Sequence, residues 1–182
     1  MSIQEFQAFF DCCVGKWSTE RTYHYLTKRE VERSHTDFVV EPITDTAKLQ
    51  VLQDNQFPIP TNLEILPGYH LEFETVSETG EKVSQQLNML FVTEGNGKII
   101  TGQYLRDRAY EEDRPIVADF QFDISKCELL MTTKYTRVVA VDSITLINPN
   151  LRIRKIITYC RPEDNQPLQE VVLVGFGVEQ KA

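Results

Sequence analysis

FFDCCVGKWSTERTYHYL, residues 9–26, contains the change in residue pattern that decides the fold. Up to Val14 the apolar residues recur at helical spacing, and Gly15 then ends that pattern. The spacing predicts a helix over residues 2–14. From Trp17 onward the chain becomes rich in Val, Ile, Thr, Tyr and Phe, which favours β-strands.

The remainder of the chain predicts about ten strands, separated by turn residues such as those of Asn148-Pro149-Asn150. A second, short helix is expected from Asp45, as its cap, to Leu52, and an irregular loop containing two prolines follows it. The predicted strands cover residues 16–28, 32–41, 68–77, 83–93, 98–106, 116–124, 128–136, 138–147, 151–160 and 169–179.

This order of elements predicts a mainly β fold with one antiparallel, up-and-down barrel over residues 16–180. So many antiparallel strands tend to close on themselves, because closure removes exposed strand edges. A barrel of eight to ten strands has room for one small ligand inside. The chain has 182 residues, which fits a single domain over residues 1–182.

The composition excludes several classes of partner. A formal net charge of −8 argues against binding to nucleic acids or to anionic membrane surfaces. The chain contains no apolar run of the roughly 20 residues that a membrane span needs, and its N-terminus lacks the pattern of a signal peptide. We therefore expect a cytoplasmic or stromal protein whose four cysteines are reduced thiols.

The tripeptide Gly15-Lys16-Trp17, at the junction of the helix and the first strand, resembles the signature of the lipocalin-like (calycin) superfamily. In that superfamily the tryptophan plugs the closed end of the barrel, and an arginine from a late strand packs over it. The resemblance makes Trp17 a marker of the fold rather than a member of the active site.

Two longer blocks resemble the S-type phycobiliprotein lyases of the CpcS/CpeS family. The first runs from Phe9 to Leu26, and the second comprises Leu129 to Tyr135 (LLMTTKY) and Asn148 to Arg154 (NPNLRIR). The resemblance implies a cyanobacterial or plastid enzyme that holds a linear tetrapyrrole, a phycobilin of the phycocyanobilin type, in its barrel. It also implies attachment of this bilin, through a thioether, to a cysteine of a phycocyanin, allophycocyanin or phycoerythrin apo-subunit.

Arg152 and Arg154 suit the two propionates of a bilin, because a guanidinium binds a carboxylate through two parallel hydrogen bonds. They are two residues apart and share one face of a strand. In an alternative interpretation, one of the two arginines packs over Trp17 and does not contact the ligand. Phe73 and Tyr135 are candidate walls for the pyrrole rings.

Arg21 and His24 match the first-strand motif that the resemblance links to bilin handling, although strict alternation places them on opposite faces of the strand. The pyrrole nitrogens require a carboxylate that keeps the bilin protonated. Glu170 joins Arg21 and His24 in our predicted catalytic set. Candidates for the carboxylate that the sequence leaves open are Glu72, Glu74, Asp119 and Glu170.

The acceptor subunit supplies the nucleophilic thiolate in this scheme, so we expect no metal, no catalytic triad and no permanently bound cofactor beyond the bilin substrate. A homodimer or a heterodimer with a paralogue is a further expectation. The alternative function is a carrier that binds a bilin or a fatty acid without transferring it. A second alternative is an interaction module whose barrel is filled by side chains.

Overall fold

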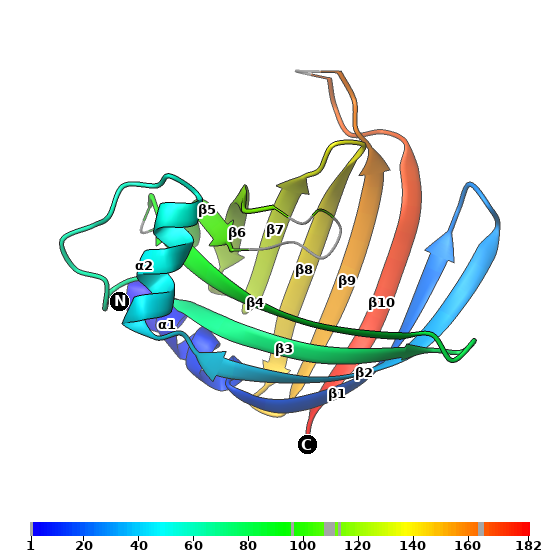
Figure 1. Cartoon of the computed structure of the whole chain (residues 1–182), viewed down its shortest axis with the longest axis horizontal. Coiled ribbons are helices and arrows are strands. Elements are labelled where there is room, and N and C mark those ends of the chain that lie inside the picture. Colours follow the sequence, from blue (N-terminus) through cyan, green and yellow to red (C-terminus); the bar gives the residue numbers. More distant parts are fainter. Residues whose placement is uncertain (1, 96, 108–111, 113, 164–165) are drawn as a thin grey trace.

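A computed structural model describes residues 2–95, 97–107, 112, 114–163 and 166–182. Within these residues ten antiparallel strands form a closed barrel, which confirms the predicted mainly β fold (Figure 1). Neither of the two described helices is long and apolar enough to cross a membrane. The strands are β1 (Gly15–Tyr25), β2 (Glu30–Pro42), β3 (Gly68–Ser77), β4 (Lys82–Thr93), β5 (Ile99–Arg106), β6 (Ile116–Asp123), β7 (Glu128–Lys134), β8 (Val138–Asn148), β9 (Leu151–Cys160) and β10 (Val171–Lys181).

Each strand pairs with its neighbours in the sequence, and β1 also pairs with β10 to close the barrel. The predicted strands are all present, and their ends lie within three residues of the predicted positions. β1 ends at Tyr25 instead of residue 28, because the following tight turn includes Arg29 in the left-handed region, with φ of 55°. β10 begins two residues later than predicted and continues to Lys181.

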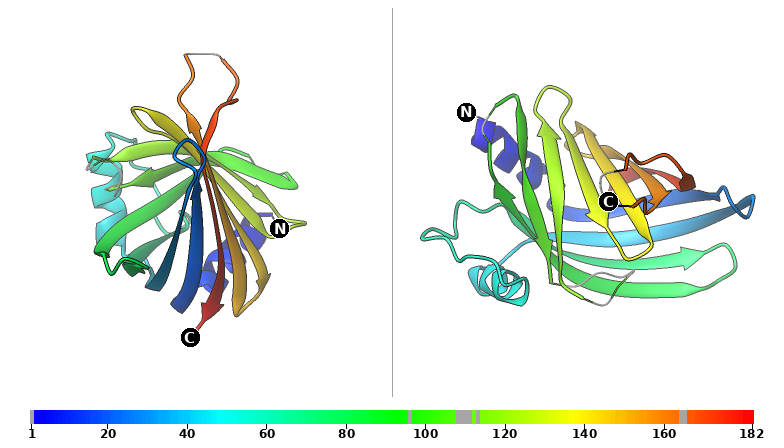
Figure 2. Two further views of the ribbon diagram at one scale, coloured as in Figure 1. Left: turned by 90° about the vertical axis from the view of Figure 1, so that its right-hand side faces the viewer. Right: turned by 90° about the horizontal axis from the view of Figure 1, so that it is seen from above.

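Helix α1 (Ser2–Cys13) covers one end of the barrel, as Figure 2 shows, and ends one residue before the predicted boundary. One face of α1 inserts aromatic side chains among those of the barrel interior. The ring of Phe6, which is fully buried, stacks on that of Phe120 with their centroids 5.3 Å apart. Phe9, Phe10, Phe91 and Phe122 belong to the same buried cluster. The helix therefore fills its end of the barrel.

Helix α2 (Asp45–Asp54) packs on the outside of the barrel, where Val51 and Leu52 bury themselves against Leu90 of β4 and Leu105 of β5. The predicted helix is present, but Asp45 is not its cap. The side chain of Thr44 accepts a hydrogen bond of 3.2 Å from the backbone nitrogen of Ala47, so Thr44 holds the N-cap position.

Candidate functional site

A cavity of about 490 Å³ lies inside the barrel, between the aromatic cluster and the hairpins β1–β2 and β3–β4. Its volume falls within the range of small-molecule binding sites. The walls combine apolar and aromatic side chains with an unusual number of charges. The charged lining residues are Arg21, Glu32, Glu81, Arg106, Asp142, Arg152 and Arg154.

A second hollow, of about 720 Å³, lies on the outer face of β1 to β4. It is shallow and open to solvent, and its polar side chains include Lys16, Asp37, Glu72 and Glu74. Enclosure from water strengthens the electrostatic contacts on which selective binding and chemistry depend. The interior cavity is therefore the candidate site.

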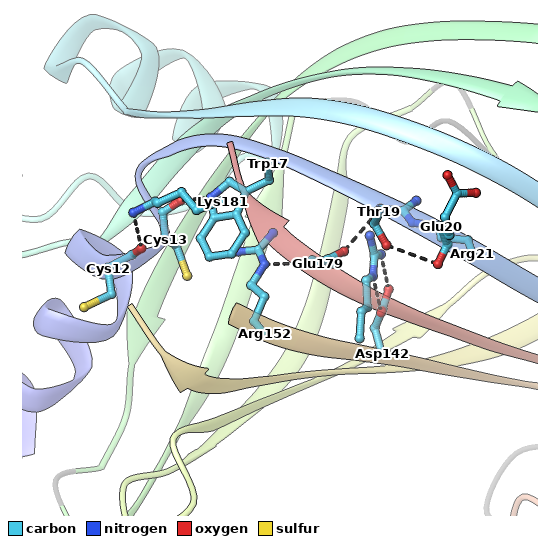
Figure 3. Close-up of polar contacts among 11 residues, drawn as sticks. Cys12, Cys13, Trp17, Thr19, Glu20, Arg21, Asp142, Arg152, Glu179 and Lys181 are labelled. Carbon is cyan, nitrogen blue, oxygen red and sulfur yellow. Dashed lines mark hydrogen bonds and ion pairs between the residues drawn. The ribbon is translucent and has the colours of Figure 1, made fainter. Parts of the chain in front are cut away.

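Arg152 packs over Trp17 at the inner end of the cavity (Figure 3). Its guanidinium carbon lies 4.6 Å from the indole centroid, and its Nε donates a hydrogen bond to the fully buried carboxylate of Glu179. Burial disfavours the charged form of Arg152, but Glu179 together with the nearby Cys13 and Tyr69 raises the pKa of the guanidinium. Of the two arginines considered for this position, Arg152 is the one that supports the tryptophan.

Arg154 and Asp142 form a bidentate ion pair on the cavity wall. The Nε and Nη2 atoms of Arg154 lie 2.9 and 2.7 Å from the two carboxylate oxygens of Asp142. Burial opposes the charge on Arg154, but the carboxylate of Asp142 holds the pKa of Arg154 well above its ordinary value. The pair presents a rigid carboxylate and a guanidinium side by side to the cavity.

Arg21 and Ser34 place buried donors in the cavity that have no protein partner. They lie opposite each other on β1 and β2. Neither the Nε of Arg21 nor the Oγ of Ser34 makes a hydrogen bond within the described part of the chain. Among the described residues, the side chain of Arg21 makes a polar contact to Glu179, with its Nη2 3.4 Å from a carboxylate oxygen. A buried donor without a partner is costly, and an acceptor group of a ligand in the cavity would remove that cost.

The opposite wall contains the predicted residue Tyr135, whose hydroxyl accepts a hydrogen bond of 2.6 Å from Nη2 of Arg106. Phe73, the other predicted wall residue, also lines the cavity. The buried Tyr69 also lines the cavity. Its burial raises its pKa. The phenol is therefore a neutral hydroxyl at neutral pH.

Two members of the predicted catalytic set lie outside the cavity. His24 is exposed on the outer face, because the pairing of β1 with both neighbours runs without a bulge and alternation is strict. Glu170 is exposed just before β10, and its backbone oxygen accepts a hydrogen bond from Cys160. The other carboxylate candidates, Glu72, Glu74 and Asp119, are exposed and point outward as well.

Sequence reasoning missed Asp142, Glu179, Arg106 and Tyr69. Asp142 carries the clearest signal, since it shares one face of its strand with Ala140 and Ile144 and is the one acidic residue among the arginines of residues 137–161. No cluster of three or more His, Cys, Asp or Glu side chains is placed to hold a metal ion in the ranges that the structure describes.

The comparisons with known proteins agree with this geometry. The family model described as CpeS-like protein matches residues 5–182. A protein named chromophore lyase CpcS/CpeS 1, from Synechococcus sp. (strain JA-3-3Ab), is 59% identical over 99% of this chain and 98% of its own length. A chromophore lyase CpcS/CpeS 2 from Paulinella chromatophora is 27% identical over 85% of this chain and 78% of its own length.

Among solved structures, the S-type phycobiliprotein lyase CPES from Guillardia theta superposes with a TM-score of 0.77 at 19% identity. The alignment covers 100% of this chain and 93% of the other, which shows that the two share a fold. The family model extends over nearly the whole chain and a relative is 59% identical over 181 residues. The chain therefore belongs to the CpeS-like protein family.

Proposed function

We propose that this protein is a bilin lyase, which binds a phycobilin of the phycocyanobilin type and attaches it through a thioether to a cysteine of a phycobiliprotein subunit. The observation that carries the proposal is an enclosed cavity with an arginine-rich lining in a chain whose relatives are named chromophore lyases. These names favour a lyase over the alternative of a non-catalytic carrier.

One propionate of the bilin binds at Arg21 and Ser34. Three arginines at this end of the cavity, Arg21, Arg152 and Arg154, share two carboxylates, those of Asp142 and Glu179. Within this group one positive charge is therefore in excess, and a ligand carboxylate neutralises it. Arg21 has the weaker contact and the unpartnered Nε, whereas Arg152 is engaged by Glu179 and Trp17. The donors of Arg21 and Ser34 then both gain an acceptor.

The pyrrole nitrogens of the bilin donate to Asp142, the carboxylate that lines the cavity. Arg154 fixes the plane of this carboxylate through its two hydrogen bonds and leaves lone pairs on both oxygens for further donors. A carboxylate beside the pyrrole nitrogens favours the protonated, electrophilic bilin. Phe73 and Tyr135 contact the conjugated rings on the walls.

The protein acts by positioning the bilin, since the nucleophile belongs to the acceptor. The acceptor thiol adds across the exocyclic double bond of ring A, so that sulfur bonds to the outer carbon and the proton ends on the adjacent ring carbon. No group leaves and no electrons are exchanged with another reactant. Holding one conformer in an enclosed cavity restricts the addition to one carbon and one face.

The partners are the bilin and the phycobiliprotein apo-subunit, and the protein acts as a homodimer or with a paralogue. Its compartment is the cyanobacterial cytoplasm or the plastid stroma, where such acceptors are made. Residues 1–182 act as a single domain in this scheme. Bilin is the substrate, and no cofactor stays permanently bound.

Co-expression with bilin-synthesis enzymes and candidate apo-subunits tests the function. We expect an acceptor subunit whose mass rises by that of one bilin only when this chain is present, and less adduct with Asp142→Asn. A matched control is Asp119→Asn, which changes an exposed outer-face carboxylate. Bilin binding with an absorbance change but no adduct on any subunit would indicate a carrier. The absence of any absorbance change would contradict both functions.

A further inference from the structure

Strand β10 has no inward side chains along the middle of its length. Its inward positions are Leu173, Gly175, Gly177 and Glu179, whereas the alternate residues Phe176 and Val178 are 49% and 41% exposed on the outside. Glycine in the interior of a strand destabilises the strand. It increases the conformational entropy of the unfolded chain, and it has no side chain to pack. Two glycines at alternate inward positions therefore need an explanation, and the side chains that line the cavity beside them supply it.

Tyr23 occupies the space above Gly175, which is its register partner on β10. A Cβ at residue 175 would lie 2.8 Å from the ring carbons Cδ1 and Cε1 of Tyr23, and 3.5 Å from Cβ of Ile156 on the other side. The first distance is too short for any normal contact. Since Gly175 is not among the residues with positive φ, space and not backbone conformation requires the glycine here.

Arg21 uses Gly177 in the same way. A Cβ at residue 177 would lie 3.2 Å from Cγ of Arg21 and 2.9 Å from Oγ1 of Thr19. The aliphatic stem of Arg21 thus lies against bare backbone of β10, and its Nη2 reaches Glu179, two residues along the strand. Both Tyr23 and Arg21 line the cavity.

Resting on the bilin-binding function proposed above, we propose that Gly175 and Gly177 set the width of the cavity and thereby its affinity for the bilin. Because neither has a side chain, Tyr23 and Arg21 lie close against β10, and the cavity keeps the width that a linear tetrapyrrole needs. A single methyl group at residue 175 displaces the whole ring of Tyr23 into the space that the ligand occupies.

A purely structural role is the rival explanation, because an aromatic ring over a cross-strand glycine also stabilises sheets. In that case alanine at residue 175 lowers the stability but leaves the affinity of the folded molecules unchanged. The two explanations therefore differ in the dissociation constant measured per folded molecule.

The test is a double-mutant cycle with phycocyanobilin as the probe, titrated by absorbance against wild type, Gly175→Ala, Tyr23→Ala and the double variant. We expect Gly175→Ala to weaken binding about tenfold when Tyr23 is present, since overpacking a filled site costs about one tenfold step in affinity. In the Tyr23→Ala background the same change should alter the dissociation constant less than about threefold, because the displaced ring is gone.

Val178→Ala, on the outer face of the same strand, is the matched control and should leave binding unchanged. An equal loss in both backgrounds, or no loss with Tyr23 present, overturns the inference. Should Gly175→Ala fail to fold, Gly177→Ala measured with Arg21 and with Arg21→Ala decides by the same criterion, with Thr19→Ala in every background so that the 2.9 Å contact to Oγ1 of Thr19 is absent. If wild type itself does not bind phycocyanobilin, the proposed function fails; if wild type binds and no cycle shows coupling, the width inference alone fails.

Discussion

The two ends of the barrel interior use the same alternating strand pattern for opposite purposes. At the end covered by α1, Phe6 and Phe9 enter the barrel and pack against Phe91, Phe120 and Phe122, each at most 3% exposed. At the other end the inward positions include Arg21, Asp142 and Arg154 around open space. The helix makes the difference, since inward side chains are packed where it inserts aromatic rings and line a cavity beyond it.

Arg152 lies at the boundary between these two regions. Its guanidinium packs on Trp17 and Phe38, and the same side chain lines the cavity. If the comparison holds, changes at the helix end should affect stability alone, changes on the cavity wall should affect binding, and changes at Arg152 should affect stability first.

The largest expected effect is that of Phe6→Ala, at the centre of the aromatic cluster. Removing a fully buried phenylalanine should lower the free energy of unfolding by about 4 kcal/mol, through lost burial and the cavity left behind. Urea denaturation measures it, with Ile3→Ala as the control, because Ile3 on the same helix is 48% exposed. A tenfold loss of phycocyanobilin affinity per folded molecule would show that the two ends are not independent.

Arg152→Met comes next, with an expected loss of about 3 kcal/mol, since it leaves the buried carboxylate of Glu179 with only a long contact to Arg21. Adding Glu179→Gln should recover part of this loss, because the uncompensated charge is then removed. Denaturation of the single and double variants measures both values. A double variant less stable than Arg152→Met would contradict the explanation.

Arg154→Lys should weaken phycocyanobilin binding about tenfold and change stability little. Lysine keeps the charge but cannot hold Asp142 through two parallel hydrogen bonds, so the carboxylate loses its fixed orientation. Absorbance titration gives the affinity, and Arg33→Lys is the control because the Arg33 side chain is 70% exposed. An unchanged affinity would show that the ion pair of Arg154 and Asp142 does not take part in bilin binding.

The smallest effect concerns His35 on the outer face. A hydrogen bond to Glu20 raises the pKa of His35, and the nearby Asp37 adds to the increase. A pKa raised in the folded state stabilises the fold fully below the unfolded value of about 6.5 and loses this contribution as the pH rises through the folded pKa. Because the side chain is 44% exposed, solvent limits the contribution to about 0.3 kcal/mol.

His35→Gln should accordingly reduce the difference between the free energies of unfolding at pH 5.5 and pH 8.5 by about this amount. Chemical denaturation at the two pH values measures the change, and a larger difference in the variant would refute the assigned sign. Bilin affinity at either pH should not respond, since His35 lies on the outer face of β2.

The fold was predictable because strands and turns depend on local pattern. Residues 68–77, for example, alternate so regularly that the predicted strand coincides with β3. The inward or outward direction of a side chain follows from alternation once the strand phase is known, so the sequence predicts Arg21 and His24 on opposite faces of β1.

Pairing across the barrel is not local, and this limited prediction of the site. Glu179 meets Arg152 because β10 lies beside β9, and it meets Arg21 because the barrel closes between β10 and β1. A single isolated acid such as Asp142 gives no sequence signal of its partner until the register with β9 is known. The choice between Arg152 and Arg154 over Trp17 stayed open for the same reason.

The pairing of β1 with β10 also determines at which point of protein synthesis the binding site can form. Arg21 and Glu179 are 158 residues apart in the chain, and the inward glycines lie on the same last strand as Glu179. Domains made on the ribosome complete their structure only after their final element has emerged. A nascent chain that has not reached β10 therefore has no closed cavity, and bilin can bind only to molecules whose translation has passed this strand.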